Sequence, residues 1–291
     1  MTAKTKRKKP QFNLFMTICF IVLVLYCLLL FAMLGWTIIN SFKNEFEFLD
    51  GPLAFPQKFS WTNYAYVLKN FVISYGTVKA DILNMFGYTI IYAGGCALVS
   101  TAVVSAVAYA TSTFKNWFIS KLICGIVLFA MIFPVIGSQA SEMQVVTNLG
   151  IKEHFWGMFI LKFNFLGIYF LIFYATFSSM SKTYREAAII DGANHYQIMF
   201  KVYYPQVLPI LTTIFLLYFV AYWNDYQTPL LYLKTKPTIS YGLFMFYNNA
   251  AIGDTPKLAA CLVVMIPILI IFLVFRKRLM NRISLEGGIK E

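Results

Sequence analysis

Long apolar runs alternate with shorter polar segments along the whole chain, and the length of the runs predicts membrane-spanning helices. A helix needs roughly 20 predominantly apolar residues to cross the hydrocarbon core of a bilayer. The pattern predicts an all-α membrane protein with six spans, at residues 12–39, 83–110, 118–137, 163–180, 208–233 and 258–275. Lys162 and Asn164 interrupt the apolar region that begins at Phe155, so the fourth span is predicted to start after them.

The polar segments between these runs are predicted to be loops. Residues 40–82 contain Pro52, Pro56 and Trp61, as expected of an external loop at the membrane interface. Residues 139–154 and 234–257 are predicted to form two further outer loops. The second apolar run is rich in glycine, alanine and serine, which allow close approach of helices in a membrane, so we expect it to lie inside the helix bundle.

Composition and charge support a multi-pass membrane protein. The chain is 59% hydrophobic and only 12% charged, so it has more apolar surface than a soluble core could hide. Basic residues gather at both ends, and positively charged flanks stay in the cytoplasm. We therefore predict a basic cytoplasmic tail at residues 1–11, a membrane domain at 12–278 and a cytoplasmic tail at 279–291. The first run is too long for a signal peptide and reads as a retained span.

Several classes of chemistry are not predicted for this chain. The net charge of +12 does not indicate nucleic-acid binding, because the basic residues flank apolar spans instead of forming a soluble basic face. The sequence contains no G-x-x-x-x-G-K-[ST] phosphate loop, no G-x-S-x-G elbow and no H-E-x-x-H pair. Its five cysteines lie inside apolar runs without C-x-x-C spacing. We expect neither an enzyme nor a cofactor or metal site.

A polar segment at residues 184–209 interrupts the second half of the chain. Nothing breaks a helix between 183 and 190, and Gly192 can adopt the left-handed conformation that ends helices. Asn194 and Gln197 have the spacing of a capping pair for a second helix, which Pro205 is predicted to end. Tyr196, Met199 and Tyr203 are expected on one side of that helix. Taken by its periodicity, the segment is equally consistent with an ordinary amphipathic loop.

The same segment contains a run of acidic, small and proline residues, namely Glu186, Ala187, Ala188, Asp191, Gly192, Ala193, Pro205 and Pro209. This run resembles the EAA signature of permease subunits from binding-protein-dependent ABC importers, specifically the carbohydrate branch. Ser181 stands where the family often has proline, and Arg185 where it often has an acidic residue. The chain is similar to the shorter, maltose-type permeases over nearly its whole length.

The resemblance implies a type I importer permease fold in a bacterial-type plasma membrane, with both termini in the cytoplasm. The segment at 181–207 would be the coupling loop, whose contacts with an ATPase would come from Glu186, Ala187, Ala188, Asp191, Gly192 and Ala193. The implied partners are the lipid bilayer, a second permease subunit, two ATP-binding subunits that hold ATP and magnesium, and an extracellular sugar-binding protein.

Two weaker candidate sites accompany the coupling loop. Trp223, Asn224 and Asp225 combine an aromatic ring with polar groups, which could stack on and hydrogen-bond a sugar in the substrate pathway. An interfacial belt explains them equally well. Gly287, Gly288 and Lys290 are similar to a tail segment that reaches the ATPase in maltose-type permeases, although a frayed terminus is an alternative interpretation.

The sequence thus predicts a permease subunit that forms half of the membrane pathway of an ATP-driven sugar importer. The alternative is a self-sufficient channel or secondary transporter for a small solute. That class places ionisable groups or broken helices near the bilayer midplane, whereas the predicted spans here are almost free of charge.

Overall fold

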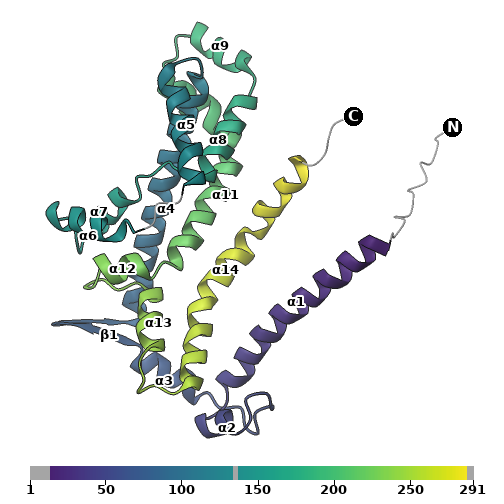
Figure 1. Ribbon diagram of the computed structural model, residues 1–291, viewed down its shortest axis with the longest axis vertical. Coiled ribbons are helices and arrows are strands. Elements are labelled where there is room, and N and C mark those ends of the chain that lie inside the picture. Colours follow the sequence, from purple (N-terminus) through teal and green to yellow (C-terminus); the bar gives the residue numbers. More distant parts are fainter. Residues whose placement is uncertain (1–13, 134–136, 287–291) are drawn as a thin grey trace. The chain divides into compact units, whose positions relative to one another are not determined.

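The computed structural model describes residues 14–133 and 137–286, with side chains described up to Phe275. The chain divides into two compact units, of which the first comprises Met1–Leu68 with Ala250–Val263 and the second Lys69–Asn249 with Val264–Glu291. Nearly all of the regular structure is helical, and the one sheet among the described residues is a two-stranded hairpin (Figure 1).

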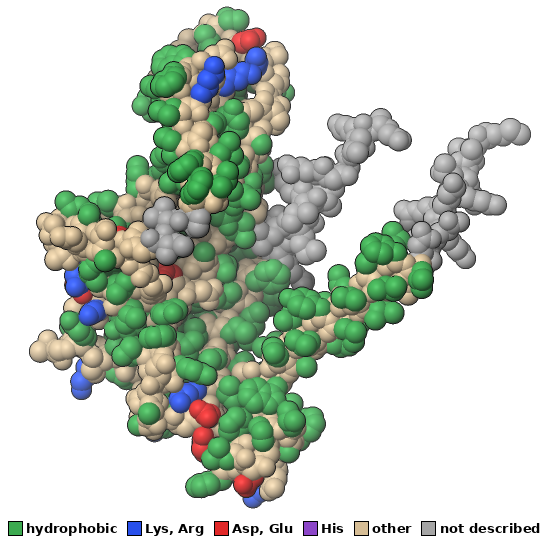
Figure 2. Space-filling view, viewed as in Figure 1, with side chains coloured by type: hydrophobic (Ala, Val, Ile, Leu, Met, Phe, Trp, Pro, Cys, Tyr) green, Lys and Arg blue, Asp and Glu red, His purple; other side chains and the backbone are tan. Residues whose placement is uncertain are grey.

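The first unit contains α1 (Leu14–Ser41), α2 (Glu45–Asp50) and the beginnings of α3 (Thr62–Asn70) and α14 (Asp254–Glu286). Hydrophobic side chains cover α1 along its length (Figure 2). The Glu45 carboxylate accepts hydrogen bonds from the backbone N–H groups of Asp254 and Thr255 at 2.9 and 3.2 Å. These bonds satisfy donors that every helix start leaves free, so they tie α2 to the beginning of α14.

The second unit is built around α4 (Ile82–Thr113), which packs against α8 (Ile168–Ser179) and α11 (Tyr204–Trp223). Ala93, Ala97, Ser105 and Ala108 of α4 are completely buried. Their small side chains let the neighbouring helices approach closely, which confirms that this run lies inside the bundle.

Four of the described helices are long and apolar enough to cross a membrane, at Leu14–Ser41, Ile82–Thr113, His195–Trp223 and Asp254–Phe275. The other two predicted spans correspond to shorter apolar helices, α5 (Phe118–Ile132) and α8. The 12 residues of α8 cover only about 18 Å at ~1.5 Å per residue. The count of six spans therefore stays a prediction.

The predicted fourth span starts too early. Residues Phe155–Leu161 form a separate helix, α7, and α8 begins only after Gly167, which has a φ of 126°. Between them the Asn164 side chain accepts a hydrogen bond from the Leu166 backbone N–H at 2.8 Å. This local bond competes with helix formation, so the polar residues break the apolar run over a longer stretch than predicted.

The segments predicted to be loops contain regular structure. Residues 40–82 hold α2, α3 and an antiparallel hairpin of β1 (Val72–Tyr75) and β2 (Val78–Asp81), with Tyr75 opposite Val78. The two other outer segments contain α6 (Gln139–Asn148) and α13 (Ile239–Tyr247).

Residues 139–154 are also held in place instead of being freely solvated. The Glu153 N–H donates to the Tyr232 carbonyl at 2.8 Å, and the Glu153 carboxylate accepts from the backbone N–H of Thr235 at 2.9 Å. Glu153 has a left-handed φ of 63°. A side chain in that conformation is strained unless its surroundings hold it, and these bonds do so.

Pro205 does not end a helix, contrary to the prediction. The chain is helical without a break through α10 (His195–Gln197), a π-helix at Ile198–Tyr203 and α11. Pro205 lies in the first turn of α11. The π-helical turn before it changes the bonding pattern at the point where the proline lacks an N–H, so the missing donor costs little. The predicted end of the fifth span, at residue 233, is also wrong. The helix α11 ends at Trp223, and α12 (Gln227–Tyr232) is a separate helix.

Gly157→Ala should destabilise the protein, because a β-carbon at Gly157 in α7 would overlap the backbone carbonyl oxygen of Ile151. Overpacking of this kind costs ~1–3 kcal/mol. We expect the melting temperature of the purified protein to fall by several degrees. Gly125→Ala in α5 is the matched control, because no atom lies within 4 Å of its β-carbon position. Equal melting temperatures for the two variants would contradict the packing of α7.

Candidate functional site

The helix–glycine–helix segment has the local structure that its sequence predicts. α9 (Lys182–Ile190) starts at Ser181, whose hydroxyl accepts from the Thr183 N–H at 3.3 Å. At its end, the Gly192 N–H donates to the Ile189 carbonyl at 3.0 Å and the Ala193 N–H to the Ala188 carbonyl at 2.9 Å. This is a Schellman cap, which requires the left-handed φ of 77° found at Gly192.

The second half of the segment begins with a capping box. The Asn194 side chain accepts from the Gln197 N–H, and the Gln197 side chain accepts from the Asn194 N–H, both at 2.9 Å. The two caps confirm the predicted pair of helices joined at Gly192. Together they fix the direction in which the chain leaves α9.

One face of the segment packs against the other helices of the second unit. Met199 and Tyr203 are buried, and the Tyr203 ring lies 5.2 Å from that of Tyr109 in α4. Ala188 and Ala193 are half-buried against the same cluster. Tyr196 was predicted on this face but is 75% exposed, because the π-helix turns Met199 and Tyr203 inward without it.

The other face of the segment is open. Four of the six predicted coupling residues are exposed, namely Glu186, Ala187, Asp191 and Gly192. They lie beside exposed apolar side chains, since Tyr184, Ile189 and Ile190 are 59%, 47% and 85% exposed. The exposed surface therefore consists of the apolar Ile190 side chain with the carboxylates of Glu186 and Asp191 nearby, on a turn that is capped on both sides.

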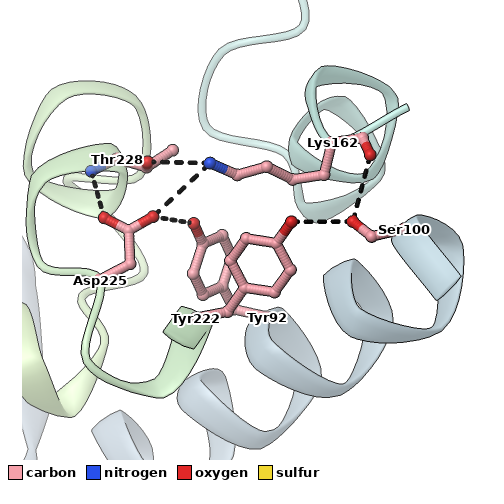
Figure 3. A network of polar contacts seen from close by, with 6 residues as sticks. All are labelled: Tyr92, Ser100, Lys162, Tyr222, Asp225 and Thr228. Atoms are coloured by element: carbon pink, nitrogen blue, oxygen red, sulfur yellow. Dashed lines mark hydrogen bonds and ion pairs between the residues drawn. The ribbon is translucent and has the colours of Figure 1, made fainter. Parts of the chain in front are cut away.

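The second candidate region is a polar network at the junction of α11 and α12 (Figure 3). The Lys162 ammonium lies 3.6 Å from an Asp225 carboxylate oxygen and donates to the Thr228 hydroxyl at 3.3 Å. The same Asp225 oxygen accepts from the Tyr92 hydroxyl at 2.8 Å, while the other accepts from the Thr228 N–H at 3.0 Å.

A second branch joins the network to α4. The Ser100 hydroxyl shares a hydrogen bond of 2.8 Å with the Tyr222 hydroxyl and donates to the Lys162 carbonyl at 3.2 Å. The Lys162 ammonium also lies over the Tyr222 ring, 5.3 Å from its centre. Side chains from α4, α11, α12 and the link before α8 therefore meet at one place.

The network keeps Asp225 ionised. Burial opposes the charge, but the hydrogen bonds from Thr228 and Tyr92 and the Lys162 ammonium outweigh it and hold the pKa of Asp225 below its usual value. The partner of Asp225 was not predicted. The sequence shows Lys162 only as an interruption of an apolar run, and a lysine there together with an aspartate after an apolar span is the signal that could indicate the pair.

The structure separates the three residues predicted for the substrate pathway. Trp223 is only 1% exposed and its ring packs against those of Phe86 and Phe219, whereas Asn224 is exposed and donates to the Val220 carbonyl. Asp225 is held in the network. Of the three, Asn224 is exposed to a ligand, whereas the Trp223 ring is buried.

Gly287, Gly288 and Lys290 lie outside the described residues. Cys19, Cys27, Cys96, Cys124 and Cys261 are free thiols. Within residues 14–133 and 137–275, no group of three or more histidine, cysteine or acidic side chains is arranged to hold a metal ion.

Comparison with known proteins gives a consistent picture. Residues 99–285 match the family described as binding-protein-dependent transport system inner membrane component. The diacetylchitobiose uptake system permease protein NgcG of Streptomyces coelicolor is 24% identical, over 93% of this chain and 88% of the relative. The multiple sugar-binding transport system permease protein MsmG of Streptococcus mutans is 27% identical, over 98% of this chain and all of the relative.

A solved structure shares the fold. A chain of a bacterial ABC transporter involved in the import of the acidic polysaccharide alginate aligns with a TM-score of 0.71 at 23% identity. The alignment covers 92% of this chain and 99% of that one.

Removing either charge of the Lys162–Asp225 pair should destabilise the protein, because the other would be left without its partner. We expect Lys162→Met and Asp225→Asn each to lower the melting temperature, and the double variant to lower it by less than the sum. The coupling energy of such contacting pairs is ~0.5–3 kcal/mol. Thermal unfolding of the four proteins measures it.

The comparison is the Lys257–Asp254 pair, at 3.3 Å, in which the Lys257 side chain is 14% exposed but the Asp254 side chain is 59% exposed. Water at Asp254 screens the attraction, so we expect a smaller coupling energy there than at Lys162 and Asp225, whose side chains are 22% and 18% exposed. Strict additivity at Lys162 and Asp225 would show that the network is not a unit.

Proposed function

Because the chain belongs to the family of binding-protein-dependent transport system inner membrane components, we propose that it is a permease subunit of an ATP-driven sugar importer. It forms half of the pathway through the membrane. The observation that carries this proposal is the exposed, doubly capped turn at Gly192, which leads without a break into the membrane helix at His195–Trp223.

A sugar as the transported solute is supported by the relatives. Their names concern diacetylchitobiose in one case and multiple sugars in another. A polar site at the exposed end of a helix suits a hydroxyl-rich ligand, and Asn224 with its neighbours at the α11–α12 junction supplies one. Trp223, Asn224 and Asp225 are therefore our candidates for the substrate pathway, with Asn224 the residue best placed for contact.

The exposed turn is the proposed contact with the ATPase. Ile190 and Ala187 present the apolar part of the surface, and Glu186 and Asp191 the charged part. Such a surface matches an interface with an apolar centre and a polar rim. Gly192 shapes the backbone, while the half-buried Ala188 and Ala193 connect the surface to the helices behind it.

The remaining parts of the assembly follow from this role. A chain without a phosphate loop needs subunits that bind ATP and magnesium, and we propose two of them, a second permease subunit and an extracellular sugar-binding protein. The ATPase lies in the cytoplasm, so the turn at Gly192 and both chain termini face that side. The basic residues at 4–9 and 276–282 support this orientation. Gly287, Gly288 and Lys290 would extend the same contact.

Gentle purification of the tagged chain from its native membrane tests the proposed function. We expect a second permease and ATP-binding subunits to accompany it, and the complex in vesicles to take up a sugar only with ATP and a binding protein. A lone homo-oligomer that transports a solute without any ATPase would instead identify a channel or secondary transporter.

Substitutions at Gly192 test the role of the turn. Gly192→Val should abolish ATP-dependent uptake, since a branched side chain is strongly disfavoured at a φ of 77°. Gly192→Asn should keep much of the activity, because asparagine tolerates the left-handed conformation. No atom lies within 4 Å of the position of an added β-carbon, so the two variants differ in backbone preference and not in fit.

Initial uptake rates, normalised to the amount of inserted protein, separate the two variants. Equal uptake by Gly192→Val and wild type would contradict the coupling role. Loss of membrane insertion in Gly192→Val would be detected by the normalisation, and Gly192→Asn would then show whether the position tolerates any side chain.

A further inference from the structure

A pocket of about 290 Å³ lies in the second unit, where the link between α4 and α5 meets the start of α9. Three basic side chains line it, from Lys115, Lys182 and Arg185, and none of the described residues that line it is acidic. Lys and Arg side chains gather at the end of the unit that carries α9 (Figure 2). Like charges repel at close range, so this arrangement favours a bound anion.

Arg185 is the deepest of the three basic residues. One of its terminal nitrogens donates to the Thr113 carbonyl at 3.4 Å. Its Nε is buried and has no hydrogen-bond partner among the described residues. A buried donor without an acceptor is unfavourable. The Arg185 side chain also lines the pocket, and a guanidinium is well suited to phosphate oxygens.

A separate apolar groove lies on α5, which follows the pocket residues in the sequence. A groove of about 420 Å³ follows one face of α5, lined by Phe118, Lys121, Leu122, Gly125, Ile126 and Phe129. It begins at the residue after Trp117, which lines the basic pocket and is 61% exposed. Tryptophan is typical of the boundary between headgroups and hydrocarbon, which would place the pocket at headgroup level and the groove in the membrane.

We propose that the pocket and the groove together bind one anionic phospholipid. Arg185, Lys115 and Lys182 hold the phosphate, and an acyl chain lies along α5 past Gly125. Basic pockets beside cytoplasmic ends of membrane helices bind such headgroups. Free phosphate would fill the pocket but leave the groove empty. A lipid has an acyl chain that can occupy the groove, so the groove favours a lipid over free phosphate.

The site also borders the proposed coupling surface. Arg185 precedes Glu186 in α9, and its contact with Thr113 joins α9 to the end of α4. A phosphate at Arg185 adds a second bridge between these elements. The lipid thus holds the turn at Gly192 in the position that meets the ATPase. That the lipid comes from the cytoplasmic leaflet rests on the orientation in the proposed function.

Lipid binding to the purified, delipidated transporter tests the site. Phosphatidylglycerol, phosphatidylcholine and inorganic phosphate are titrated separately, with bound lipid counted by native mass spectrometry. We expect phosphatidylglycerol to bind most tightly. Removing one basic residue near an anionic lipid weakens binding about fivefold, so Lys115→Gln combined with Lys182→Gln should weaken it about twenty-five-fold.

Two further variants make the result specific. Lys201→Gln removes one exposed charge outside the pocket and should leave binding unchanged. Gly125→Leu fills the groove and should weaken binding of phosphatidylglycerol while binding of inorganic phosphate stays the same.

The proposal would be overturned by equal binding of the two lipids, by equal effects of Lys201→Gln and the pocket variants, or by phosphate binding as tightly as phosphatidylglycerol. Loss of ATP-binding subunits from the pocket variants, with lipid binding intact, would assign the pocket to a protein partner instead. Because lipid binding is measured without transport, failure of sugar uptake would contradict only the proposed function.

Discussion

Close packing of α4 against α8 and α11 connects the two candidate sites of this protein, the segment around Gly192 and the Lys162–Asp225 network. The completely buried small residues Ala97, Ser105 and Ala108 allow it, and Ser105 shares a hydrogen bond of 2.8 Å with Tyr204 in α11. Towards one end α4 supplies Tyr109 and Thr113, which hold the segment around Gly192. From its middle part it supplies Tyr92 and Ser100 to the Lys162–Asp225 network. Larger residues on this helix would separate its neighbours and disturb both regions together.

This connection gives the proposed coupling a physical route. A force on the turn at Gly192 acts on α10, the π-helix and α11, which form one continuous helix. The far end of α11 carries Tyr222, and the next residues lead to Asp225 in the ion pair with Lys162. A rigid helix between a docking surface and a polar junction is the element that rocking motions of transporters require. The π-helical turn is the place where its regular bonding changes, and is therefore where it would bend most easily.

The local structure of the coupling segment could be predicted because caps follow from a few neighbouring residues. Gly192, Asn194 and Gln197 specify their turn without help from the rest of the chain. The continuation of the helix through Pro205 could not be predicted, because a proline normally ends a helix and the π-turn that accommodates it depends on burial of Met199 and Tyr203. The pairing of Lys162 with Asp225 joins residues far apart in the sequence, and only the packing of α4, α11 and α12 brings them together.

The central claim is that the exposed face at Gly192 is covered by an ATP-binding subunit. Ile190→Cys places a thiol at a position of this face that is 85% exposed, and its labelling by a membrane-impermeant maleimide in inside-out vesicles tests the claim directly. The chain without the substitution supplies the background from its native cysteines. We predict rapid labelling when the chain is expressed alone and strong protection when the ATP-binding subunits are present. Labelling at the same rate in both preparations would contradict the claim.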